Sequence, residues 1–182
     1  MNLWLRLIWA LVSWRSRSSI SPWDMASRPF RVWPTDLDIF NHMNNGKFLS
    51  LLDLGRFDLM NRSGFWKALA AKNWYPVVVA ETITFRKSLH PWLVFNIETK
   101  IAGWDKDAFY AEQRFTVNDE IYASAMVRIR FLARPRGIVT PQQILELVGA
   151  PAITPVLPDW VADWAASVNL PKGKEPAPSI WN

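Results

Sequence analysis

The segment TDLDIFNHMNNGKF, residues 35–48, gathers the side chains of this chain that are best suited to chemistry. Asp36 and Asp38 carry carboxylates, which can act as a general base or a nucleophile, and His42 can hold a proton. The segment then turns abruptly apolar, as it would where a loop leads into a helix. Free backbone N–H groups at a helix start carry partial positive charge and can bind an oxyanion. A base and an anion site could therefore lie together here.

The polar residues of this segment also have structural interpretations. Asp36 is most simply a turn residue that accepts hydrogen bonds from nearby backbone amides. Asn44 or Asn45 is expected to cap the helix, with a further role in holding the loop left open. His42 could orient a water molecule, a substrate or Asp38, or it could be only a structural hydrogen-bonding residue.

A second carboxylate interrupts the strand pattern of YPVVVAETITFRK. With a period of two, Glu81 shares one face with four apolar residues, Val77, Val79, Ile83 and Phe85. An unpaired carboxylate would be costly on a buried face, so Glu81 could be a second acid/base group. The alternatives are that the faces of the strand are reversed, or that Glu81 pairs with an arginine.

Composition excludes several classes of site. The 182 residues, half of them hydrophobic, suit one compact domain with short extensions. Cysteine is absent and only two histidines are present, so disulfides, thiolate nucleophiles and a metal centre are not expected. The chain lacks a P-loop, a dinucleotide-binding glycine motif and a serine nucleophile elbow, so no cofactor is expected either.

The net charge of +5 favours an anionic partner. Charge alone does not distinguish nucleic acid, an anionic membrane surface and a phosphate-bearing small molecule. We expect no nucleic acid partner, because no glycine-aromatic RNA-binding motif is present. The cations that could meet phosphates, or could simply be solvated, are Arg86, Lys87, Arg128, Arg130, Arg134 and Arg136.

The chain is expected to comprise three regions. Residues 1–29 form a tryptophan-rich helix and a serine- and proline-rich linker; the apolar run is too short to span a bilayer and lacks a cleavage pattern. Residues 1–14 could lie at a membrane surface, or dock on their own domain or a partner subunit. The domain covers residues 30–136, and residues 137–182 form an extension with two short helices, over residues 141–150 and 158–168.

The domain itself predicts an α+β fold. A strand at residues 30–34 precedes the polar loop, and a helix runs from Asn45 to about Asn61 and is capped near Gly64. Gly55 lies in its apolar stripe, where it would let a sheet approach closely, and Asp58 lies on the opposite face. Four antiparallel strands follow, over residues 75–87, 93–104, 108–117 and 121–132. A curved sheet wrapped around one helix leaves long edges, so dimerisation is expected.

This order of elements, together with DLDIFNHMNN, resembles the hotdog-fold acyl thioesterases of the 4-hydroxybenzoyl-CoA thioesterase-like group. Their signature is D-x-x-G-H-[VM]-N-N-x-x-[YF], and Asn41 stands where glycine is common. The residues that match it are Asp38, His42, Met43, Asn44, Asn45 and Phe48. Residues 31–60 look like the branch that includes thioesterase superfamily member six.

The resemblance implies hydrolysis of an acyl-CoA or acyl-carrier thioester to a carboxylic acid and a free thiol. It implies that Asp38 is the nucleophile or general base. We expect a homodimer or a dimer of dimers, located in the cytoplasm with or without membrane contact. Phe40 replaces an asparagine of the plant acyl-carrier thioesterases, so their full catalytic set does not transfer. The alternative is a non-catalytic acyl- or lipid-binding hotdog protein at a membrane surface.

Overall fold

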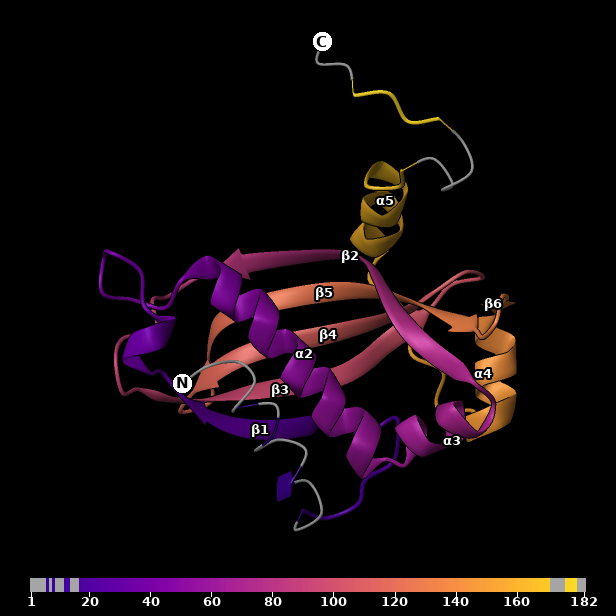
Figure 1. Cartoon of the computed structure of the whole chain (residues 1–182), viewed down its shortest axis with the longest axis horizontal. Coiled ribbons are helices and arrows are strands. Elements are labelled where there is room, and N and C mark those ends of the chain that lie inside the picture. Colours follow the sequence, from indigo (N-terminus) through magenta and orange to yellow (C-terminus); the bar gives the residue numbers. More distant parts are fainter. Residues whose placement is uncertain (1–5, 7, 9–11, 14–16, 171–175, 180–182) are drawn as a thin grey trace.

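A curved antiparallel sheet wraps around one long helix in this protein (Figure 1). The computed structural model describes residues 6, 8, 12–13, 17–170 and 176–179. The elements are β1 (Ala26–Arg31), η2 (Pro34–Asp36), α2 (Asn45–Arg62), α3 (Phe65–Ala71), β2 (Trp74–Phe85), β3 (Val94–Trp104), β4 (Phe109–Val117), β5 (Glu120–Ala133), β6 (Ile138–Val139), α4 (Pro141–Val148) and α5 (Asp159–Ser167). The predicted α+β class is confirmed.

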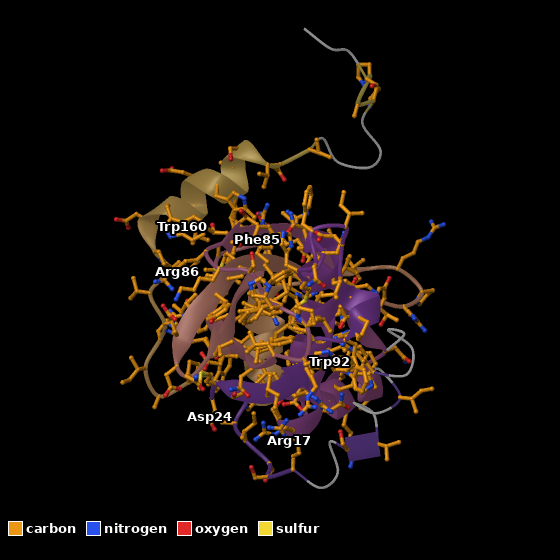
Figure 2. The ribbon with its side chains drawn as sticks, turned by 90° about the vertical axis from the view of Figure 1, so that its left-hand side faces the viewer. Arg17, Asp24, Phe85, Arg86, Trp92 and Trp160 are labelled. Atoms are coloured by element: carbon orange, nitrogen blue, oxygen red, sulfur yellow. The ribbon has the colours of Figure 1, made fainter. Side chains whose placement is uncertain are left out.

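The strands are ordered β1-β3-β4-β5-β2, and β6 pairs with the end of β5. The predicted central helix, the four strands that follow it and both C-terminal helices are confirmed. Sequence reasoning missed α3 and β6, which are short. α3 begins directly after Gly64, whose φ of +70° ends the long helix. In Figure 2, α5 projects from the body of the domain, with Trp160 on its side nearer the sheet.

The main core lies between α2 and the concave face of the sheet. Phe48, Leu51 and Leu52 of the helix are buried against Phe95 and Phe115 of the sheet. The alternating inward positions predicted for β5 are also confirmed, since the odd-numbered residues from Ala123 to Phe131 are all buried. This core fixes the start of α2 relative to the sheet.

Gly55 lies at the closest approach of α2 to the sheet, as predicted. A Cβ atom at this position would be 2.7 Å from Ile97 Cγ2, 2.8 Å from Thr99 Oγ1 and 2.9 Å from Gln113 Nε2. All three neighbours belong to packed strands. Any side chain here would therefore separate the helix from the sheet.

We expect Gly55→Ala to destabilise the protein by about 1–3 kcal/mol, because the overpacking outweighs the better helix propensity of alanine. Urea unfolding of wild type and variant measures the difference. Ser50→Ala, on the outer side of the same helix, should change stability by less than about 0.5 kcal/mol. A stabilising effect of Gly55→Ala would show that helix and sheet are not in close contact.

The first strand corrects the prediction. The sequence pattern predicts it at residues 30–34, but β1 begins at Ala26, so part of the predicted linker belongs to the sheet. Pro29 lies inside the strand, paired with Asn96. Because β1 is an edge strand, the missing N–H of this proline removes no bond from the interior of the sheet.

Asp58 also corrects the prediction, because it is buried and not on a solvent face. Its carboxylate lies 2.8 Å from Arg28 Nη1, 3.2 Å from Arg62 Nη1 and 3.6 Å from Arg17 Nη1. Arg28 belongs to β1, and Arg17 to the segment before it. The periodicity of one helix cannot reveal that another segment covers its polar face.

The strand that carries Glu81 is irregular where the prediction assumed regular alternation. The register of β2 against β5 shifts between Val78 and Ala80. Ile83 and Phe85 pack toward α2, as predicted, but Val78 rather than Val77 or Val79 lines the space beneath the helix. The bulge shifts the alternation of β2 by one residue. The residues before it therefore face the opposite way from the prediction, and those after it face as predicted.

Candidate active site

The loop between η2 and α2 closes on itself. Leu37 and Met43 form an isolated bridge, the Asp38 N–H donates to the His42 carbonyl at 2.9 Å, and the Asn41 N–H donates to the Asp38 carbonyl at 3.1 Å. Asn41 has a φ of +60°, a conformation that glycine and asparagine adopt most readily. Asparagine can therefore stand at the position where the signature commonly has glycine.

Asp38, the predicted base or nucleophile, and His42, the candidate catalytic residue whose role the sequence leaves open, are in contact. Asp38 Oδ1 accepts a hydrogen bond from the Phe40 N–H at 2.9 Å, and Oδ2 lies 3.2 Å from His42 Nδ1. The Phe40 ring stacks on the imidazole, with the ring centroids 6.0 Å apart. The Asp38 side chain is 21% exposed. The carboxylate is thus held in one orientation and remains accessible to water.

The start of α2 distinguishes the two asparagines. Asn44 is the N-cap, since its Oδ1 accepts from the Gly46 N–H at 2.8 Å and its carbonyl accepts from the Lys47 N–H at 2.8 Å. Asn45 is the first helical residue. Within the described part of the chain, its backbone N–H has no hydrogen-bond acceptor. This N–H is free to bind an oxyanion.

Asp36 is buried, and its contacts fit the structural interpretation. Its Oδ2 accepts from the Trp33 N–H at 2.9 Å and pairs with Arg6, while its carbonyl accepts from the Asn44 N–H at 2.9 Å. Asp36 therefore holds the N-cap residue in place.

The Arg6 contact favours docking of that part of the N-terminal region on its own domain. Trp4, Trp9 and Trp14, on which the membrane-surface interpretation rests, lie outside the described residues. Among the helical segments that the structure describes, none combines the length and the hydropathy that a bilayer crossing requires.

Glu81 faces α2 and meets a polar cluster that the sequence did not predict. Its Oε2 lies 4.0 Å from Arg56 Nη1, which donates to Gln113 Oε1 at 2.6 Å; Arg56 Nη2 pairs with Asp53. Gln113 Nε2 in turn donates to the Leu52 carbonyl at 2.9 Å. The Arg56 guanidinium fits the salt-bridge interpretation of Glu81. The inward position of Gln113 in its strand was the available signal for this cluster.

Burial raises the pKa of the Glu81 carboxyl above its ordinary value of 4.5, although Arg56 opposes the shift and Asp53 adds to it. The ionised form is therefore less favourable in the folded than in the unfolded protein. This penalty is absent at low pH, where both states are protonated. It develops as the pH rises from the unfolded pKa through the folded pKa.

We therefore expect Glu81→Gln to raise the Tm relative to wild type at pH 7 and to leave it unchanged near pH 3. Thermal unfolding across this pH range measures both values. Glu120→Gln is a control of opposite sign, because Lys87 and Arg86 lower the pKa of Glu120. If Glu81→Gln lowered the Tm at pH 7, the Arg56 pair would outweigh the burial of Glu81.

An apolar cavity of about 340 Å³ lies beneath the C-terminal half of α2. Its walls come from α2, α3, α4 and the sheet, and include Phe57, Met60, Phe65, Ile101, Ile129 and Phe131. An acyl chain would need an apolar space of this kind between helix and sheet. The cavity begins near Asp53, eight residues after Asn45, which is about 12 Å along the helix axis. It is therefore separate from the Asp38 loop.

Three of the predicted phosphate ligands are occupied by protein groups. Arg86 and Lys87 both pair with Glu120, at 2.8 and 2.7 Å. Arg128 is buried beneath α5, where its Nη1 donates to the Ala165 carbonyl at 3.4 Å. α5 of the C-terminal extension covers this part of β5, although the sequence pattern alone indicates that Arg128 faces solvent. Across the described ranges, no group of three or more metal-ligating side chains comes together.

The comparisons with known proteins agree with this geometry. Residues 32–165, well over half of the chain, match the family model of the Thioesterase-like superfamily. The chain belongs to this superfamily. The Asp38 loop, the central helix and the whole sheet except β1 lie inside the matched range, so the resemblance seen in the sequence is confirmed.

Individual proteins of known sequence or structure are also similar to this chain. The chain is 35% identical over 144 residues to Protein THEM6 of Danio rerio, covering 75% of this chain and 69% of that protein. It is 39% identical over 99 residues to Protein THEM6 of Xenopus laevis, covering 54% of this chain and only 48% of that protein. The crystal structure of YbaW, a probable thioesterase from Escherichia coli, matches with a TM-score of 0.63 and 19% identity, covering 67% of this chain and 98% of that one. The hotdog fold is thereby confirmed.

Proposed function

We propose that this protein hydrolyses an acyl-CoA or acyl-carrier thioester to a carboxylic acid and a free thiol. The observation that carries the proposal is the placement of the Asp38 carboxylate in a closed loop that leads directly to the free Asn45 N–H. A base and an oxyanion donor are the two groups that acyl transfer requires. Membership of the Thioesterase-like superfamily supports this class of reaction.

In the proposed reaction, Asp38 takes a proton from a water molecule, and the oxygen of this water attacks the carbonyl carbon of the thioester. The Asn45 N–H donates to the oxyanion of the tetrahedral intermediate. When the intermediate collapses, the carbon–sulfur bond breaks and the thiolate leaves and is protonated. The alternative is direct attack by Asp38, which gives an anhydride that water then hydrolyses.

His42 is proposed as a positioning residue, because its Nδ1 contacts the Asp38 carboxylate. Asn44 has a supporting role as the cap that exposes the Asn45 N–H. Glu81 lies beside Arg56 near the apolar cavity, so we propose that it acts on substrate binding there and not on the proton transfer at Asp38.

We also propose that the protein is a homodimer, alone or as part of a dimer of dimers. Among the strands that the structure describes, β2 pairs only with β5 and leaves its other edge open. Val78, Val79 and Phe85 of this strand are exposed apolar residues. A second copy that pairs along this edge would cover both features. Sedimentation at several concentrations tests this, and a monomer at all of them would contradict it.

A second candidate function rests on the apolar cavity, which could bind an acyl chain without any reaction. The protein would then be a non-catalytic acyl- or lipid-binding protein, with residues 1–14 at a membrane surface and the rest in the cytoplasm. A thiol-release assay over short, long and aromatic acyl-CoAs separates the two. Steady release supports the thioesterase, whereas saturable acyl binding without release supports the binding protein.

A further inference from the structure

Arg6 is a buried cation that reaches the base of the Asp38 loop from outside the range that matches the superfamily, residues 32–165. Its side chain is 2% exposed. One guanidinium nitrogen, Nη2, donates both to the Asp36 carboxylate and to the Arg31 carbonyl, the latter at 3.0 Å. Arg6 therefore joins the N-terminal region to the end of β1 and to η2.

The Asp38 loop is a short hairpin over residues 36–44, and the pair Asp36 and Asn44 forms its base. There the Asn44 N–H donates to the Asp36 carbonyl at 2.9 Å. The bridge from Leu37 to the other arm, and then the bond from the Asp38 N–H to that arm, follow toward the tip. The direction of the hairpin therefore depends on how its base is fixed.

Both groups of the proposed reaction are attached close to this base. Asp38 follows Asp36 by two residues on one arm, and Asn45 directly follows Asn44 at the end of the other. Reacting groups must be held in a precise geometry, and a misplacement of about 1 Å can cost about 100-fold in rate. A small movement of Asp36 would therefore displace the base and the oxyanion donor relative to each other.

Asp36 is a buried carboxylate that needs a counter-charge. Its side chain is 2% exposed, and an ionised group in such a place is unfavourable unless it is paired and hydrogen-bonded. Among the residues that the structure describes, no cationic side chain other than Arg6 forms an ion pair with it. Without Arg6, the carboxylate would be drawn toward water and the base of the hairpin would move with it.

We propose that Arg6 is a positioning residue for thioester hydrolysis, acting through Asp36 on Asp38 and on the Asn45 N–H. This rests on the proposed function. Arg6 touches neither the carboxylate of Asp38 nor the oxyanion donor, so its effect is on their geometry. The N-terminal region is then a working part of the active site and not only an extension of the domain.

The test starts from two substitutions of Arg6. Arg6→Met keeps the apolar stem but removes the charge and the donors, and should lower kcat for acyl-CoA hydrolysis by about 10- to 100-fold, with KM changed by less than about twofold. Arg6→Lys should restore most of the loss, because a single nitrogen makes both contacts in wild type. Arg17→Met is the matched control, since Arg17 pairs with Asp58 away from the loop, and it should leave kcat unchanged.

Hydrogen exchange of the full chain, followed by mass spectrometry, tests the positioning without any turnover. In Arg6→Met, the amides of residues 36–45 should exchange faster while those of β3, β4 and β5 keep their wild-type rates. If wild type releases no thiol but exchange rises in residues 36–45, only the proposed function fails. If exchange rises equally throughout the protein, or if Arg6→Lys is as slow as Arg6→Met in an active enzyme, the positioning role is wrong.

A double variant keeps the test decisive if Arg6→Met does not fold. Arg6→Met with Asp36→Asn removes both buried charges together, which is tolerated better than leaving one of them unpaired. It should fold and still show the reduced kcat and the faster exchange of residues 36–45. Wild-type values of both in the double variant would overturn the proposal.

Discussion

Replacing Asp38 with asparagine is expected to lower kcat/KM for acyl-CoA hydrolysis by about 10²–10⁴-fold. The amide keeps the size of the side chain and can still accept from the Phe40 N–H, but it cannot take a proton from water or attack the carbonyl. Thiol release at saturating and subsaturating substrate separates the effect on kcat from that on KM. The loss should fall on kcat, because the carboxylate acts in the transition state.

The matched control is Asp163→Asn, an exposed carboxylate on α5 that should leave turnover unchanged. Equal activity of Asp38→Asn and wild type would remove Asp38 from the mechanism. A single turnover in ¹⁸O-labelled water distinguishes its two roles. Label found in the Asp38 carboxylate would identify an anhydride intermediate and therefore a nucleophile.

Asp58→Asn is expected to destabilise the protein by about 3–5 kcal/mol, the largest effect on folding that we predict. The Asp58 side chain is fully buried, and the Arg28 side chain beside it is 2% exposed. Without the carboxylate, buried guanidinium groups would repel one another and lose their counter-charge. Urea unfolding at pH 7 measures the free energy of unfolding.

Asp53→Asn is the matched control, because it removes an aspartate–arginine pair from the same helix. The Asp53 side chain is 65% exposed, so this pair should contribute less than about 1 kcal/mol. Equal losses in the two variants would mean that burial of Asp58 does not determine its contribution. A small loss in both would mean that residues 17–25 and β1 are not held to α2 by this cluster.

The sequence predicted the elements whose signals are local. The helix from Asn45 and the strands after it follow from apolar periods that each element carries in its own residues. The position of Asp38 before the helix start follows from the same local pattern, and so does the use of an asparagine as cap. The catalytic role of Asp38 came from the resemblance and stays a prediction.

The tertiary structure decided everything that depends on contacts between distant segments. It buried Asp58 beneath β1, placed Arg56 and Asp53 beside Glu81, and brought Trp23 against the end of α4. Residues that meet across 25 to 126 positions leave no periodic signal in either segment. The sequence by itself therefore determined the fold and the loop where the chemistry is expected. Pro22, Trp23, Ile144 and Val148 line the cavity only because the two extensions pack on that fold.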